Sequence, residues 1–207
     1  MMKSKWMGVA AAAVIVLGVG ILIDRLRNPA ADLSLELPEF VGAQLALQAE
    51  PLLADGGTAL IIMPDMPGAV DPYAAAYRRG FEATMADRLP GVAVVDARIT
   101  ADPMRLQSGQ PIFGPGELTR LIREHPDCGV FVSLAGLPDV SRKQRRDWKD
   151  DHPKLIVFAP LGGPAGALID AGVVQAMIVP RDAGLEEEIG GDSVQARFDQ
   201  DYVVLSR

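Results

Sequence analysis

Polar side chains and glycines come at or just after the ends of several short apolar runs in this 207-residue sequence. Asp65 and Ser133 end two such runs, Arg181 follows another, and Gly162 and Gly163 stand between an apolar run and a helical stretch. If the runs are strands of one parallel sheet, their carboxyl ends meet at one edge, where ligands bind in such folds. Carboxylate, hydroxyl and guanidinium groups accept and donate hydrogen bonds there. We therefore predict these five residues as ligand-binding positions.

The acidic, hydroxyl and glycine positions also have an ordinary structural explanation. An acidic or hydroxyl side chain at the end of a strand caps turns and helices in many proteins. The glycines at 162 and 163, with Gly166, precede a helix as a phosphate-binding loop does. A dinucleotide fingerprint, however, requires glycine at position 161, which is Leu161, and Pro164 removes a backbone donor. A tight turn is favoured over a nucleotide site at this loop.

No catalytic or metal-binding site is predicted. Cys128 is the single cysteine, so an intramolecular disulfide framework and a cysteine-rich metal site are excluded. The two histidines, His125 and His152, each precede a proline and have no periodic carboxylate partner. The sequence also lacks a Gly-x-Ser-x-Gly elbow, a Walker loop and the acidic and lysine pattern of a phosphorelay receiver. We expect no enzymatic activity, no metal and no cofactor.

The first strongly apolar segment begins at Trp6 and ends at Ile23 and carries no charge. A helix of that length spans about 27 Å, close to the hydrocarbon thickness of a bilayer. Lysines precede the segment, charged residues follow it, and Trp6 is placed as an interfacial aromatic residue would be. A cleaved signal peptide is the alternative, but no small-x-small site follows the apolar run directly. We expect an uncleaved transmembrane anchor, with the lipid bilayer as its partner.

The charge distribution predicts where the rest of the chain lies. Positive charge tends to remain in the cytoplasm, so the N-terminal lysines favour a cytoplasmic N-terminus and an extracytoplasmic, periplasmic-side domain of a single-pass membrane protein. The net charge of −7 and the pI of about 4.8 argue against nucleic acid as a partner. A basic run over 142–149 is a candidate membrane contact with Trp148 as an anchor, although a solvated helix face is the favoured interpretation because Asp147 dilutes the positive charge.

The remaining pattern predicts an α/β fold. Apolar residues make up 49% of the chain and charged residues 23%, which is enough to build a core. Short continuous apolar runs alternate with helical stretches, and this pattern is typical of a parallel sheet covered on both faces. We expect a doubly wound, mostly parallel sheet of five to six strands in three layers. The predicted organisation is a tail over 1–5, an anchor over 6–23, a tether with a short amphipathic helix over 24–57 and an α/β domain over 58–207.

Residues 58–180 resemble the type I periplasmic binding proteins. The similar segments are Leu-Ile-Ile-Met-Pro at 60–64, Tyr-Arg-Arg-Gly-Phe-Glu-Ala-Thr-Met-Ala at 77–86, Pro-Gly-Val-Ala-Val-Val-Asp at 90–96, Val-Ser-Leu-Ala-Gly-Leu-Pro at 132–138 and the helix–glycine–strand segment at 167–180. Members of that family bind sugars and other small solutes between two lobes, and bacterial sugar-responsive repressors share their fold. The length available here is sufficient for one lobe.

Two functions remain open from the sequence. The resemblance implies a membrane-anchored module outside the cytoplasm that binds or senses a small-molecule solute. The alternative is a non-catalytic, membrane-tethered assembly protein of the same fold, whose partner is another membrane protein. A pocket lined by the predicted positions would favour the first function, and an exposed apolar patch would favour the second.

Overall fold

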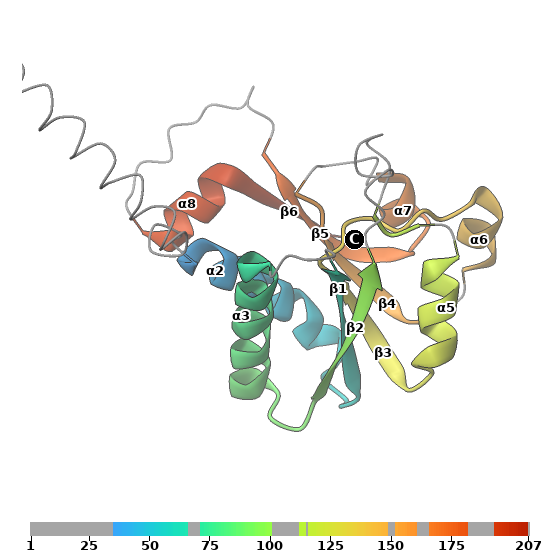
Figure 1. Ribbon diagram of the computed structural model, residues 1–207, viewed down its shortest axis with the longest axis horizontal. Coiled ribbons are helices and arrows are strands. Elements are labelled where there is room, and N and C mark those ends of the chain that lie inside the picture. The colour runs from blue at the N-terminus through green and yellow to red at the C-terminus, as the bar shows by residue number, and fades with distance from the viewer. Residues whose placement is uncertain are drawn as a thin grey trace, which may run out of the picture. The chain divides into compact units, whose positions relative to one another are not determined.

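The computed structural model of the chain describes residues 35–65, 71–100, 112–114, 116–148, 152–160, 166–181 and 193–206 (Figure 1). The predicted anchor at 6–23 lies outside these residues, and among the helices that are described none has the length and hydropathy to cross a bilayer. The folded unit extends from Leu35 to the C-terminus.

Six strands form one sheet in the order β2-β1-β3-β4-β5-β6. The first five are parallel, and β6 pairs antiparallel with β5. The predicted α/β class with a mostly parallel sheet is therefore confirmed. The strands are β1 (Thr58–Asp65), β2 (Ala93–Thr100), β3 (Cys128–Ser133), β4 (Lys154–Phe158), β5 (Val174–Pro180) and β6 (Tyr202–Ser206).

Helices cover both faces of the sheet, which gives three layers (Figure 1). On one face lie α2 (Glu36–Ala49), α3 (Pro72–Arg88) and α8 (Val194–Asp201), and on the other lie α5 (Glu117–Glu124), α6 (Arg142–Asp147) and α7 (Gly166–Asp170). A short 3₁₀ turn, η1 (Glu50–Leu52), follows α2. Strands β1, β3, β4 and β5 are mostly buried on both faces and have apolar residues on both sides, whereas the edge strand β2 is largely exposed.

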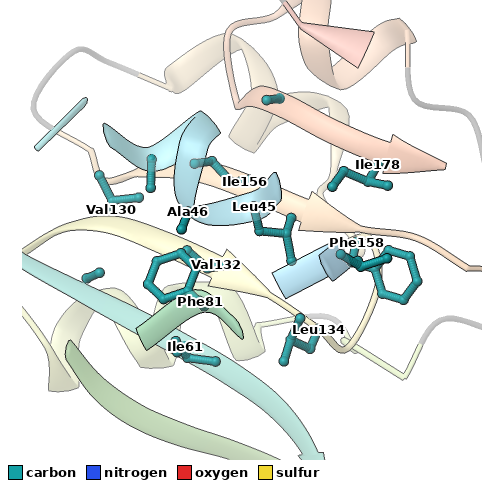
Figure 2. Close-up of a cluster of buried hydrophobic side chains, with 14 of the residues drawn as sticks. Leu45, Ala46, Ile61, Phe81, Val130, Val132, Leu134, Ile156, Phe158 and Ile178 are labelled. Atoms are coloured by element: carbon teal, nitrogen blue, oxygen red, sulfur yellow. The ribbon is translucent and has the colours of Figure 1, made fainter. Parts of the chain in front are cut away.

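Successive residues of each central strand belong to opposite cores. Ile61 of β1 lies in the core beneath α2 and α3, whereas its neighbours Leu60 and Ile62 lie in the core beneath α5. The first core, shown in Figure 2, combines residues from four parallel strands with helical residues such as Leu45 and Phe81. This alternation follows from the two-residue period of a strand and explains the continuous apolar runs of the sequence.

Helix α2 belongs to the α/β unit. The crossover from β1 to β2 runs through α3 on one face, but the later crossovers run through α5, α6 and α7 on the other. Without α2 and α8, the face of the sheet that carries α3 would have no helix over β3, β4 and β5. Val41 of α2 is buried there, as are Leu45 and Ala46, which Figure 2 shows in this core. The segment predicted as a tether over 24–57 thus contains a core helix, and the α/β unit begins before residue 58.

Helices α2 and α3 pack backbone to backbone. A β-carbon at Gly42 would lie 1.9 Å from the Tyr77 carbonyl oxygen, and one at Gly80 would lie 1.8 Å from the Glu39 carbonyl oxygen. Only glycine fits at such a distance. Beside this contact, the Arg79 guanidinium donates two hydrogen bonds to Glu39 Oε1, at 2.9 and 2.7 Å. Asp71 caps the start of α3, since its Oδ1 accepts a hydrogen bond from the backbone N–H of Tyr73 at 2.9 Å.

Candidate functional site

The carboxyl ends of β1 and β3 form the point at which the strand order reverses. From β1 the chain crosses to β2 on one side, and from β2 it returns past β1 to β3 on the other. Crossovers on opposite faces diverge at this point, and in doubly wound sheets the crevice between them is where ligands bind. Asp65 ends β1 and Ser133 ends β3, so two of the predicted positions lie at this reversal.

Asp65 is paired with Arg98 at this edge. The register places Arg98 of β2 opposite Met63, two residues before Asp65 on the neighbouring strand. Arg98 Nη1 lies 3.6 Å from Asp65 Oδ1, and the two side chains are 64% and 48% exposed. A pair so exposed contributes little to stability, because solvent screens it. It instead presents an acceptor and a donor side by side on the surface.

Ser133, the last residue of β3, is buried and does not reach this surface. Its side chain is fully buried, and its hydroxyl donates a hydrogen bond of 2.7 Å to the Gly136 carbonyl oxygen. Gly136 has φ +81°, a conformation that favours glycine, and it closes the turn after β3. The backbone N–H of Leu134 donates to the Ile62 carbonyl oxygen at 2.8 Å, which fixes the turn to β1. Ser133 therefore holds the turn at the edge, with its hydroxyl already engaged.

Arg181 lies on the far half of the edge. Its strand, β5, is three strands from β1 in the sheet order, which corresponds to about 14 Å at the usual strand spacing. Its backbone N–H donates to the Asp201 carbonyl oxygen at 2.9 Å. The structure thus separates Arg181 from Asp65. Gly162 and Gly163 lie outside the described residues.

Asp96, an acidic residue of the same strand as Arg98, does not belong to this edge. Strand β2 continues to Thr100, so Asp96 lies in mid-strand opposite Ile61. Its carboxylate pairs with Arg78 Nη1 of α3 at 2.9 Å. Asp96 therefore ties a helix to the sheet and is not part of the edge.

Strand β2 contributes two residues to the edge, of which sequence reasoning did not assign Thr100. Thr100 lies opposite Asp65 in the register, and Arg98 reaches Asp65 from the adjacent strand. The alternation of apolar and polar residues in β2 could have identified these two positions. Ala97 and Ile99 are buried, so Arg98 and Thr100, which alternate with them, are exposed.

Other reactive groups lie away from this edge or within the core. Cys128 opens β3 in the core, where burial raises the pKa of its thiol. No group of three or more histidine, cysteine, aspartate or glutamate side chains suited to a metal is found in the described parts of the chain. The chemistry available at the edge is reversible hydrogen bonding and ion pairing by Asp65, Arg98 and the turn after Ser133.

Comparisons with known proteins bear on the fold. No protein-family model matches the sequence. No curated protein matches it either. Solved structures do match, with sequence identities below 20%. Similarity to solved structures at this level of sequence identity shows a shared fold.

Three of the similar structures come from different bacteria. A solute-binding protein of an ABC transporter from Burkholderia graminis, in complex with D-arabinose, aligns with TM-score 0.52 and 17% identity over 82% of this chain and 59% of its own. A carbohydrate transporter solute-binding protein from Agrobacterium radiobacter, also with D-arabinose, aligns with TM-score 0.50 and 18% identity over 84% and 59%. A protein classed as a LacI transcriptional regulator from Bacteroides fragilis aligns with TM-score 0.52 and 17% identity over 69% and 47%.

The chain covers between 47% and 59% of the length of these three proteins. The strand order and the layered arrangement agree with the resemblance inferred from residues 58–180, which is confirmed at the level of the fold. The chain has a type I periplasmic-binding-protein-like fold.

Proposed function

We propose that this chain is a membrane-anchored module on the extracytoplasmic side that binds or senses a small polar solute. The observation that carries the proposal is the Asp65–Arg98 pair, exposed at the reversal of strand order. Ligands of doubly wound sheets bind at this point. The fold shared with sugar-binding proteins supports the same role.

The chemistry of the pair suits a solute that both accepts and donates hydrogen bonds. Asp65 is an acceptor and Arg98 is a donor, so adjacent hydroxyl groups of a sugar can satisfy both. An amino acid meets the same pair with its ammonium and carboxylate groups. Two of the similar solved proteins hold D-arabinose, which makes pentoses the first solutes to test. No nucleophile with an adjacent base is found in the described part of this edge, which favours binding over catalysis.

A thermal-shift screen of the purified full chain tests solute binding. The panel contains pentoses, hexoses and amino acids, each at a concentration far above a micromolar dissociation constant. A solute at about 100 times its dissociation constant stabilises the folded state by about 2.7 kcal/mol. In a protein of this size, that stabilisation raises the melting temperature by about 5–10 °C. A melting temperature unchanged by every solute would contradict the proposal.

Anchoring and orientation need a separate experiment. The full chain, expressed in a bacterial host, is expected in the membrane fraction after alkaline carbonate washing, and a variant lacking residues 1–23 is expected in the soluble fraction. Protease added outside spheroplasts should digest the α/β unit of the full chain. Release of the full chain by carbonate would contradict the anchor, and protection from protease would contradict the orientation.

A tethered assembly module is the second candidate, and one observation favours it. Strand β2 is at the edge of the sheet, and Val95 on it is 37% exposed. An exposed edge strand can pair with a strand of another protein. A full chain that shows no thermal shift with solutes, but forms a defined complex that Val95→Lys abolishes, would select this function.

A further inference from the structure

Three arginines line an open hollow between α6 and α7. Arg142, Arg145 and Arg146 follow the i, i+3, i+4 spacing, which places them on one face of α6. Together with Ala167 and Ala171 of the α7 segment, they border a volume of about 530 Å³. Figure 1 shows α6 and α7 on the same side of the sheet. Asp65, Ser133 and Arg181 are not among the residues that border the hollow.

The helix that carries these arginines is held in place. Ser141 Oγ accepts a hydrogen bond of 3.2 Å from the Gln144 backbone N–H, and Gln144 Oε1 accepts one of 2.9 Å from the Ser141 N–H, which forms a capping box. Gln144 Nε2 also donates to Thr119 Oγ1 on α5 at 3.2 Å. Trp148, at the end of α6, packs against the core beneath α5. The guanidinium groups therefore extend from a fixed base.

The three arginine charges at the hollow favour the binding of an anion. Three guanidinium groups on one helix face repel one another. The ion pairs recorded between described residues use other arginines, namely Arg78, Arg79, Arg98, Arg120 and Arg197. The opposite wall has small side chains, Ala167 and Ala171, which leave space rather than fill it. The concentration of positive charge on this face also contrasts with the net charge of −7 of the whole chain.

We propose that this hollow binds a phosphate group, carried either by a soluble phosphate ester or by an anionic lipid headgroup. The planar guanidinium donates paired hydrogen bonds that match the oxygens of phosphate, and three of them can surround one group. The volume of about 530 Å³ lies in the range of small-ligand pockets and accommodates a phosphate with an attached glycerol. A nucleic acid is disfavoured because the acidic chain repels a long polyanion.

Two variants of equal charge separate this site from general electrostatics. The site variant is Arg142→Gln with Arg145→Gln and Arg146→Gln. The control variant is Arg88→Gln with Arg123→Gln and Lys143→Gln, which removes three exposed positive charges outside the lining of the hollow. A further variant, Arg145→Lys, keeps the charge but removes the planar fork. Circular dichroism and melting temperatures establish that each full-chain variant is folded.

Soluble and lipid-borne phosphate are tested in parallel arms. In the first arm, glycerol 3-phosphate is titrated calorimetrically into the full chain. In the second, co-sedimentation with phosphatidylglycerol vesicles is compared with co-sedimentation with phosphatidylcholine vesicles, so that insertion of the N-terminal segment contributes to both. We expect the site variant to weaken glycerol 3-phosphate binding, or the preference for phosphatidylglycerol, at least 10-fold. The control variant should equal the wild type, and Arg145→Lys should fall between them.

Loss in the first arm identifies a soluble phosphate ester as the source, and loss in the second alone identifies a lipid headgroup. The proposal is overturned if the wild type neither binds glycerol 3-phosphate nor prefers phosphatidylglycerol. It is also overturned if the site and control variants lose binding equally. Neither result depends on whether a solute binds at Asp65.

Discussion

The backbone of Gly80 on α3 lies so close to Glu39 on α2 that a β-carbon at position 80 would stand 1.8 Å from the Glu39 carbonyl oxygen. Helix α2 can therefore reach the sheet only because α3 has no side chain at this position. The same arrangement occurs at Gly42, whose β-carbon would meet the Tyr77 carbonyl oxygen. The two glycines together allow α2 to cover the face that the crossover helices leave open.

Gly80→Ala is predicted to destabilise the protein. At an exposed position inside a helix, replacing glycine with alanine usually stabilises the protein by up to about 1 kcal/mol, because alanine has the higher helix propensity. Here the helices must separate, and overpacking of this kind costs about 1–3 kcal/mol or more. Urea unfolding of the full chain, followed by circular dichroism, measures the difference.

Gly166→Ala is the matched control, because Gly166 is also helical and a β-carbon there meets nothing within 4 Å. We expect this variant to equal or slightly exceed the wild type in stability. A Gly80→Ala variant as stable as Gly166→Ala would contradict the close packing of α2 on α3.

The start of α3 depends on a single side chain. Asp71 Oδ1 accepts hydrogen bonds from the backbone N–H groups of Tyr73, at 2.9 Å, and Ala74, at 3.3 Å. Asp71→Ala leaves these donors without that acceptor and is predicted to cost about 1 kcal/mol of unfolding free energy. Asp71→Asn retains a capping oxygen and should remain close to the wild type. Equal unfolding midpoints for Asp71→Ala and Asp71→Asn would show that the cap is not formed.

Alkaline pH is predicted to destabilise the fold through Tyr77. Burial, followed by the negative charge of ionised Tyr202, raises the pKa of Tyr77 well above its usual value of about 10. The ring packs against Phe158 with centroids 4.9 Å apart. Above about pH 10 the unfolded chain releases this proton while the folded chain keeps it, so stability falls as the pH rises.

The measurement is the unfolding free energy at several pH values between 9 and 11. The raised pKa of Tyr77 lowers the free energy of unfolding by up to about 1.4 kcal/mol for each pH unit above pH 10. Tyr77→Phe should show a shallower decline than the wild type. Parallel declines in the two proteins would exclude Tyr77 as the cause.

The fold could be predicted from the sequence because its strands are short, continuous and apolar. Runs such as 59–63 and 130–134 are buried on both faces, as strands of a parallel sheet between two helical layers are. The role of α2 could not be predicted. Its sequence predicts a short helix without showing which surface that helix covers. The need for a helix on this face follows only from the strand order and from the sides on which the crossovers run.

The candidate site was predictable only in part. The rule that ligands bind at carboxyl ends of strands identified Asp65 and Ser133, which lie on neighbouring strands. Sequence cannot show that the Ser133 hydroxyl is consumed within its own turn, or that Arg98 reaches Asp65 across β1 and β2. The first fact depends on the geometry of the turn after β3. The second depends on the register between β1 and β2, in which a change of two residues would place Asp96 where Arg98 lies.

The most direct test of the solute-binding account is calorimetric titration of pentoses, hexoses and amino acids, beginning with D-arabinose, into the wild-type full chain and into Asp65→Asn. A charged hydrogen bond is worth about 1.5–3 kcal/mol, so the variant should bind about 10- to 150-fold more weakly. Glu124→Gln, which alters a carboxylate on α5, should bind as the wild type does. The account predicts saturable heat with at least one of these solutes and its loss in Asp65→Asn. No heat with any of them, or equal affinity in Asp65→Asn and the wild type, would contradict it.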